Sequence, residues 1–381
     1  MKLAKLYLLM CSLILLSCKN EKPSITVERE DYHQAIDKLS ETLVHDIFSP
    51  PSASRSYVYP SIAAYETLNQ NSKSYHSLAN QLNGLSALKI SANPKEVNLK
   101  LASIIAYLDV SKELVFSKEI LTNYRDSLYV QWDNQNSKDF KTAKQYGLKI
   151  SNHIIEWMNS DGYQETRSMP TYNIYSEDPS TWQPTPPAYM DGIEPHWNKL
   201  RPFILDSASQ FKPKRHPKFS MKPKTLFFEE VLTVYETVKE IRQKGDESEE
   251  IKIAQFWDCN PFVSVNKGHY MFAEKKITPG AHWIGIAKIA NNKTNASFDK
   301  TVFAHAKISI AIADAFISCW DEKYRSNLVR PETLINEYID PAWLPVLQTP
   351  PFPEYTSGHS VVSNASAVAL TSIYGDDFEF L

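Results

Sequence analysis

The sequence predicts an all-α protein, and three observations support this fold class. Strand-like alternation is scarce in the 381 residues, whereas apolar residues recur at helical spacing in several stretches. A hydrophobic content of 43%, with 12% aromatic residues, suffices for a large buried core. The chain has only 10 glycines and no G-x-G-x-x-G, Walker A, H-E-x-x-H or C-x-x-C motif, which argues against phosphate-cradling loops and the common zinc sites. A formal net charge of −3 gives no reason to expect a nucleic-acid partner.

The N-terminus predicts export. Residues 1–17 have the character of a signal peptide, because two lysines precede an apolar run (6–16) that is too short to span a bilayer. Leu-Leu-Ser-Cys at 15–18 resembles a bacterial lipobox, in which the cysteine is lipidated and becomes the mature N-terminus. We therefore expect a lipid anchor on Cys18, a polar tether over 18–30, and a membrane-anchored protein facing the periplasm or the cell surface. The alternative is an ordinary secretory signal with an incidental cysteine.

Helices are expected where apolar residues follow a helical period. The first such stretch ends at Ser49-Pro50-Pro51, because prolines disfavour the helical conformation. Prolines and aromatic residues recur between 166 and 225, which indicates an irregular connection. The amphipathic stretches are residues 31–47, 96–117, 137–159 and 226–243. The mature chain is thus divided into an N-terminal helical region (31–165), the connection (166–225) and a helical core (226–381).

A further helix is expected from residue 301 to about Arg330. It carries apolar residues nearly all round, which is typical of a helix buried in a core. Pro331 disfavours the α conformation at the residue before it and predicts the end of this helix. Asp314 lies inside the apolar run and needs a partner there, so both a functional and a structural role remain open for it.

Two of the four cysteines remain after the signal and the anchor are assigned. Cys11 would be removed with the signal peptide and Cys18 would carry the lipid. Cys259 and Cys319 either pair in an oxidising compartment or stay as buried free thiols, and they cannot form a metal site by themselves.

PPFPEYTSGHS, residues 350–360, predicts an extended approach to a helix N-terminus. Its three prolines exclude a helix, whereas the residues that follow have helical spacing. Ser357, Gly358 and His359 are therefore expected in the first turn. The first N–H groups of a helix have no partner within it and lie at the positive end of its dipole, so this position favours an anion.

Lys323 and Arg330 are the second candidate pair. Seven residues apart on one helix, they would lie on the same face with about 10 Å of rise between them. Two cations on a buried face repel each other unless an anion joins them. Arginine offers a planar fork and lysine a point charge, so this anion is expected to be an oxyanion.

The two motifs together resemble a known superfamily. Lys323, six residues, Arg330-Pro331 and then Ser357-Gly358-His359 look like the first two signature motifs of the type 2 phosphatidic acid phosphatases and vanadium haloperoxidases. Thr356 replaces the usual proline, as in the soluble secreted branch that resembles vanadium-dependent haloperoxidases. Other similar segments are HDIFSPPSASRSYVYPSIAAYE (45–66), FWDCNPF (256–262), KITPGAHW (276–283), DAFISCWDEKYRSNLVRPET (314–333) and LQTPPFPEYTSGHS (347–360). The resemblance covers most of the mature chain and implies a helical bundle of this type.

The resemblance also implies roles for the motif residues. Lys323 and Arg330 would bind equatorial oxygens of vanadate or phosphate, with added hydrogen bonds from Ser357 and the Gly358 amide. His359 would be the acid–base residue. In a haloperoxidase the cofactor would be vanadate, Lys323 would also polarise the bound peroxide, and halide would be oxidised. In an acid phosphatase the same cations would stabilise the transferring phosphoryl group of a phosphomonoester, without a cofactor.

One departure from the superfamily pattern limits this expectation. A third motif, S-R-x5-H-x2-D, supplies a second arginine and the axial histidine, and it does not occur between His359 and Leu381. No axial ligand is therefore assigned, and we expect the sequence to be truncated before this motif. Three functions follow: a vanadium-dependent haloperoxidase in its full-length form, an acid phosphatase on the same scaffold, or a non-catalytic anchored protein that binds oxyanions.

Overall fold

The prediction of a helical fold is confirmed by a computed structural model. It describes residues 22–70, 72–88, 90, 93–261, 264–267, 270–273 and 275–380. The predicted signal peptide and Cys18 lie outside the described residues. Within them, the strands that form a sheet are β1 (Ser264–Lys267) and β2 (Tyr270–Ala273), which pair antiparallel as one hairpin.

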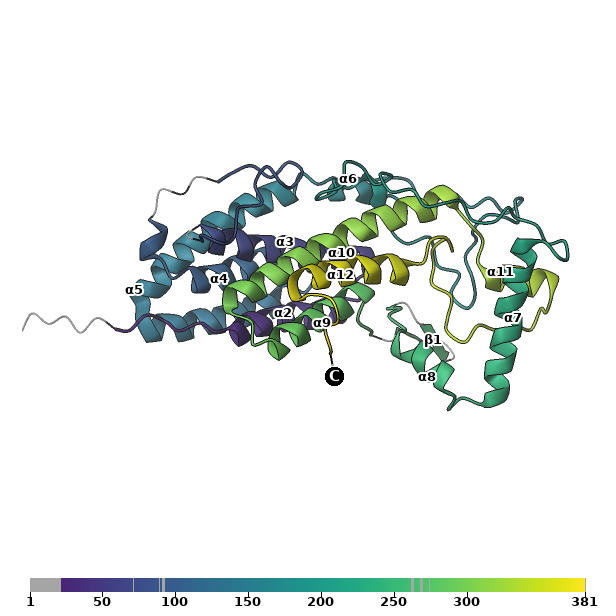
Figure 1. Cartoon of the computed structure of the whole chain (residues 1–381). Helices are drawn as coiled ribbons and strands as arrows, with labels where there is room; N and C mark the ends of the chain where they lie inside the picture. Colours follow the sequence, from purple (N-terminus) through teal and green to yellow (C-terminus); the bar gives the residue numbers. More distant parts are fainter. Residues whose placement is uncertain are drawn as a thin grey trace, which may run out of the picture.

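Seven of the described helices form the bundle, and the remaining larger elements gather at one end of it (Figure 1). The bundle contains α2 (Arg29–His45), α3 (Pro50–Asn69), α4 (Leu99–Lys112), α5 (Lys118–Met158), α9 (Pro279–Lys293), α10 (Phe298–Ser326) and α12 (Gly358–Tyr374). The end elements are α7 (Leu226–Lys244), α8 (Glu249–Phe256), the hairpin and α11 (Pro331–Tyr338). A one-turn helix, α6 (Tyr163–Arg167), and 3₁₀ turns at Pro94–Glu96 and Trp197–Lys199 complete the described helices.

Helix α10 is the central element of the bundle. It packs against α3, α9 and α12, and in Figure 1 α12 runs along it. It is long and apolar enough to cross a membrane, but 78% of its most apolar window is buried inside the protein. Its apolar character is therefore explained by packing on all sides, as predicted for a core helix.

The predicted end of this helix is wrong. Helix α10 ends at Ser326, and its C-cap Asn327 is left-handed with φ 46°, while its N–H donates to the Lys323 carbonyl at 2.8 Å. Asparagine tolerates this conformation better than most residues and so terminates the helix. Arg330 instead occupies the N-cap position of α11, and Pro331 begins that helix. Lys323 and Arg330 therefore do not share a helix face.

Helix α3 begins where the sequence was expected to stop a helix. Ser49 caps it, its hydroxyl oxygen accepting the Ser52 N–H at 3.3 Å, and Pro50 and Pro51 occupy the first positions. Proline is favoured at the start of a helix, because its missing N–H has no partner there anyway and its φ is already helical. Helix α9 begins in the same way, with Thr278 as the cap and Pro279 as the first residue.

Helix α5 is longer than predicted and packs closely against α4. It contains a non-helical residue, Asn136, with φ −152° and ψ 94°, so two helical segments meet there. The second segment corresponds to the predicted helix at 137–159. Gly147 permits the close approach of α4, because a Cβ atom built there would lie 2.6 Å from the Ala102 carbonyl oxygen.

The irregular connection is fixed to the bundle by Asp314. Its carboxylate accepts the N–H groups of Phe203, Ile204 and Leu205 at 2.7, 2.8 and 3.2 Å. Burial raises the pKa of Asp314, and the three backbone hydrogen bonds oppose that rise. Of the two roles left open for Asp314, the structure supports the structural one.

One hydrophobic cluster runs through helices from both predicted helical regions. It includes residues of α2 to α5 and of α9, α10 and α12, whereas α7 and α11 pack in a second cluster with Val329 and Trp343. The regions 31–165 and 226–381 therefore share a core, and the boundaries assigned to them remain a prediction about chain organisation.

Candidate active site

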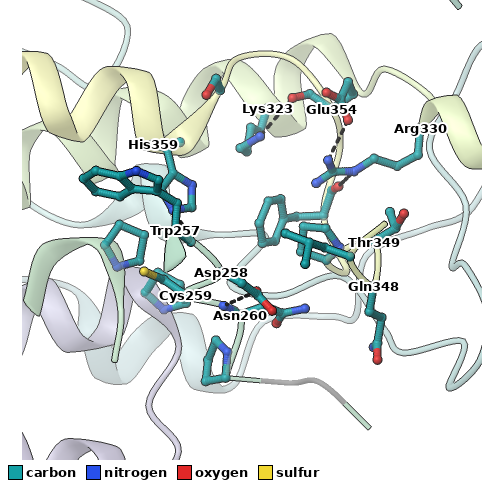
Figure 2. A pocket seen from close by; sticks show the side chains of 18 of the residues that line it. Trp257, Asp258, Cys259, Asn260, Lys323, Arg330, Gln348, Thr349, Glu354 and His359 are labelled. Carbon is teal, nitrogen blue, oxygen red and sulfur yellow. Dashed lines mark hydrogen bonds and ion pairs between the residues drawn. The ribbon is translucent and has the colours of Figure 1, made fainter. Parts of the chain in front are cut away.

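One cavity of about 300 Å³ is lined by five motif residues, namely Lys323, Arg330, Ser357, Gly358 and His359. Its wall is formed by residues 257–261 after α8, the C-terminal part of α10, the extended segment 347–354 and the first turn of α12. Figure 2 shows Lys323 and Arg330 both directed toward Glu354, with His359 and Trp257 on the other side of the cavity. The fold thus brings together Lys323, Arg330, Ser357, Gly358 and His359, which sequence analysis proposed for an oxyanion site.

Lys323 is a buried cation held by main-chain oxygens. It is 1% exposed, and its Nζ donates to the carbonyl oxygens of Pro353 at 2.9 Å and Glu354 at 3.0 Å. Nζ also lies 4.9 Å from the centroid of the Phe352 ring. Burial lowers the pKa of Lys323 to about 8, and the neighbouring Arg330 contributes to the decrease. An oxyanion in the cavity would favour the protonated form.

Arg330 has one nitrogen without a hydrogen-bond partner in the described part of the chain. Its Nε donates to the Phe352 carbonyl at 2.7 Å, its Nη1 pairs with the Glu354 carboxylate at 2.5 Å, and its guanidinium lies 4.9 Å from the Phe352 centroid. Nη2 is buried and has no hydrogen-bond partner among the described residues. A buried, unsatisfied charged donor costs free energy, and an oxyanion in the cavity would satisfy it.

The predicted helix N-terminus is confirmed. Ser357 is the N-cap of α12, and its Oγ accepts the N–H of Ser360 at 3.2 Å and the hydroxyl of Ser360 at 3.0 Å. Gly358 begins the helix, so its N–H belongs to the first turn, where α-helical partners do not exist. This end of the 17-residue helix favours negative charge in the cavity.

His359 is anchored by a main-chain carbonyl oxygen of the segment after α8. Its Nε2 lies 3.1 Å from the main-chain oxygen of Trp257. A carbonyl only accepts hydrogen bonds, so this contact assigns the proton of the neutral ring to Nε2 and leaves Nδ1 as a proton acceptor. The ring is exposed, but the protein around it still lowers its pKa by desolvation, and His282 and Lys323 lower it further.

Sequence analysis missed three side chains of this cavity and its surroundings. Glu354 and Trp257 line it, and the His282 ring stacks on the Trp257 indole with centroids 4.7 Å apart and an interplanar angle of 20°. Trp257 lies in a segment that was noted only for its family resemblance, and Glu354 lies in the segment that was expected to approach a helix N-terminus, but neither side chain was assigned a role. Their roles depend on contacts across the fold, which no local pattern signals.

The two remaining cysteines are free and buried, so of the two alternatives for them the structure supports the second. Cys259 lines the cavity, and burial raises the pKa of its thiol to about 11. Cys319 lies beneath the second motif, with Sγ 3.5 Å from the Thr356 hydroxyl. Among the described residues, no group of three or more His, Cys, Asp or Glu side chains could hold a metal ion.

The geometry therefore suits a small oxyanion. A buried ammonium, a guanidinium with one nitrogen unpaired among the described residues, and a helix N-terminus supply positive charge and N–H donors on one side. An imidazole that can exchange a proton lies across the cavity. Such an arrangement can stabilise negative charge that develops on an oxygen atom while a proton is transferred.

Comparisons with known proteins agree with this description. A bacterial vanadium-dependent iodoperoxidase superposes with a TM-score of 0.90 and 55% sequence identity, covering 94% of this chain and 84% of that chain. A bacterial vanadium-dependent chloroperoxidase shares the fold in its holo form (TM-score 0.55, 14% identity, covering 89% of this chain and 80% of that chain). The apo form of that enzyme gives a TM-score of 0.59 and 16% identity, covering 90% of this chain and 81% of that chain. The family model of the VCPO second helical-bundle domain matches residues 336–380, and no curated protein sequence matches the chain significantly.

Proposed function

The chain belongs to the vanadium-dependent haloperoxidase branch of the superfamily, and we propose that it oxidises iodide with hydrogen peroxide. The observation that carries the choice of halide is the 55% identity to a bacterial vanadium-dependent iodoperoxidase across 84% of that protein. Halide and peroxide are the small-molecule substrates of this family. The phosphatase and the non-catalytic alternatives are not favoured, because the three solved structures described above are of peroxidases.

We assign the vanadate site to Lys323, Arg330, Ser357 and the Gly358 amide. The buried Nη2 of Arg330, which lacks a protein partner in the described part of the chain, supports the fit of an oxyanion. The position of Gly358 in the first turn of α12 supplies a further N–H donor. When bound, vanadate activates hydrogen peroxide toward attack by a halide ion.

Residues of the chain would then stabilise the negative charge on oxygen and transfer the proton that the reaction consumes. Oxidation of iodide removes two electrons from it, breaks the peroxide O–O bond and consumes one proton, giving hypoiodous acid and water. Lys323 is placed to stabilise negative charge on oxygen, because its ammonium is buried and its pKa of about 8 leaves it mainly protonated at neutral pH. His359, with its Nε2 proton held by Trp257, is placed to transfer the proton.

The walls of the cavity support a weakly hydrated halide. Trp257, Trp320 and Phe352 contribute large aromatic surfaces to it. An anion that enters such a cavity loses water, and the loss costs less for iodide than for chloride, because the larger ion is less strongly hydrated. This physical argument and the named relative favour the same halide.

The test is a halide-oxidation assay on the full-length gene product loaded with orthovanadate. We expect vanadate-dependent oxidation of iodide that is lost in Lys323→Ala. Lys307→Ala is a matched control, since it removes a lysine of α10 that does not line the cavity, and it should keep the activity. Vanadate-loaded protein that oxidises no halide, or that releases phosphate from a monoester instead, would contradict the proposal.

We also propose that the protein is exported and anchored through a lipid on Cys18. Only the sequence supports this, since Cys18 lies outside the described residues. Fractionation of cells that express the wild type and Cys18→Ser is the test. The wild type should be found with membranes and the variant in the soluble fraction, and equal distributions would refute the anchor.

A further inference from the structure

Glu354 connects the two cations of the site. Its carboxylate pairs with Arg330 Nη1 at 2.5 Å, and its carbonyl oxygen accepts from Lys323 Nζ at 3.0 Å. Its own N–H donates to the Leu328 carbonyl at 3.0 Å, so the main chain here is fixed to the loop between α10 and α11. Figure 2 shows the side chain beside both cations. A carboxylate therefore occupies part of the positively charged wall that would receive an anion.

Arg330 does not depend on Glu354 for its orientation. Its Nε is fixed by the Phe352 carbonyl at 2.7 Å, and its guanidinium lies over the Phe352 ring. The carboxylate takes one of the two terminal nitrogens, and the other is left without a protein partner in the described part of the chain. The main effect of Glu354 on a bound oxyanion is therefore electrostatic rather than positional.

The charges around the cavity indicate what this effect is. Among the described residues, the charged side chains that line it are Lys323, Arg330, Glu354 and Asp258, and His359 can add a charge when protonated. The Asp258 carboxylate is neutralised by an ion pair with Lys276, whose Nζ lies 2.6 Å from Asp258 Oδ2. In the part of the chain that the structure describes, Glu354 is thus the carboxylate that opposes the two cations at the cavity wall. A carboxylate in this position repels a second negative charge, so it disfavours an anion of charge −2 relative to one of charge −1.

Resting on the proposed function, we propose that Glu354 is a specificity-determining residue that selects vanadate over phosphate. The two oxyanions have the same shape, but vanadate keeps its second proton to a higher pH, so near neutrality it is mainly a monoanion while much phosphate is a dianion. A protonated oxygen can donate a hydrogen bond to the Glu354 carboxylate, whereas a second negative charge is repelled by it. Discrimination thus comes from a repulsive group within an attractive site.

The test compares binding of orthovanadate and inorganic phosphate to the full-length protein by calorimetry, without peroxide or halide. Glu354→Gln keeps the shape of the side chain and removes its charge. At slightly alkaline pH we expect this variant to bind phosphate about tenfold more tightly, because removing one like charge at such a distance changes an affinity by roughly this factor. Its affinity for vanadate should increase much less. Glu337→Gln, an exposed carboxylate of α11, is the matched control and should change neither affinity. An unchanged ratio of the two affinities, or an equal weakening of both, would overturn the proposal.

A second measurement on the wild type does not depend on the folding of a variant. Phosphate affinity should fall as the pH rises from about 6 to about 7.5, since phosphate loses its second proton in this range. An affinity that rises with the dianion would overturn the proposal. If the protein oxidises iodide with vanadate but shows no such discrimination, only this inference fails. If it binds no vanadate, the proposed function fails with it.

Discussion

The Nζ atom of Lys323 lies 2.9 Å from the carbonyl oxygen of Pro353, with the lysine side chain buried in the protein. A second carbonyl, that of Glu354, accepts from the same ammonium at 3.0 Å. These two oxygens compensate only part of the cost of burying a charge, and desolvation lowers the pKa of Lys323 to about 8. The charge of this site therefore depends on pH within a range that is easily measured.

Oxyanion affinity should fall as the pH rises through about 8, because the lysine must be protonated to attract the anion and loses its proton in that range. Lys323→Arg keeps a positive charge at every accessible pH, so its affinity should not show this decrease. Calorimetric titration of vanadate across the range, with both proteins, is the measurement. Ionisation of vanadate itself affects both alike, so parallel curves would contradict the prediction.

Arg330→Lys should weaken vanadate binding about 10- to 100-fold, since it removes the fork that bonds Phe352, Glu354 and the oxyanion at once. The positive charge is retained, so the loss would report the geometry of the guanidinium. Arg325→Lys is a control of the same chemistry in α10, because Arg325 pairs with Asp321 and Glu322 and does not line the cavity. Equal affinities of the two variants for vanadate would show that the fork is unimportant.

Local sequence patterns predicted the start of α12 and the burial of α10. Both depend on strong local rules, namely prolines before a helix and apolar residues on all sides of one. The predicted end of α10 was wrong, because the helix is terminated by the left-handed conformation of one asparagine, Asn327. The stop of the first helix before Pro50-Pro51 was predicted correctly, since α2 ends at His45, but the helix α3 that these prolines begin after a capping serine was not predicted.

Sequence analysis predicted the two cations and the imidazole of the site. It did not predict the groups that position them. Lys323 and Arg330 come together through the carbonyl and carboxylate oxygens of residues 352–354 rather than through a shared helix face. The Trp257 carbonyl that holds His359 is 102 residues away in the chain. Such pairs result from tertiary packing, and a single sequence has no local pattern that reveals them.

Gly147→Ala should destabilise the protein by about 1–2 kcal/mol, because the new methyl group would lie 2.6 Å from the Ala102 carbonyl oxygen and overpack the α4–α5 contact. Alanine gains up to about 1 kcal/mol of helix propensity over glycine, which offsets only part of this cost. Gly285→Ala, in α9, is the matched control, since its new Cβ would meet nothing within 4 Å. Urea unfolding should therefore show a lower free energy of unfolding for Gly147→Ala and a higher one for Gly285→Ala. Stabilisation in both variants would contradict the prediction.

The rings of His33 and His305 have centroids 5.6 Å apart in the core, and both residues are 0% exposed. None of their four ring nitrogens has a hydrogen-bond partner among the described residues, and Glu30 approaches His33 Nδ1 only to 3.6 Å. Burial lowers the pKa of His33 to about 4 and that of His305 to about 3. Both rings are therefore neutral in the folded protein at neutral pH.

The protein should lose stability as the pH falls below about 6.5, the pKa of histidine in an unfolded chain. Below that pH the unfolded chain binds protons that the folded state does not, so the free energy of unfolding decreases toward pH 4, by about 2–4 kcal/mol at pH 5. His305→Leu removes one of the two groups and should roughly halve the decrease between pH 7.5 and pH 5, whereas His76→Leu, at an exposed histidine, should leave it unchanged. Urea unfolding at pH 7.5 and at pH 5 gives the free energy of unfolding of both variants. If His305→Leu loses as much stability between these pH values as the wild type, the acid sensitivity originates elsewhere in the fold.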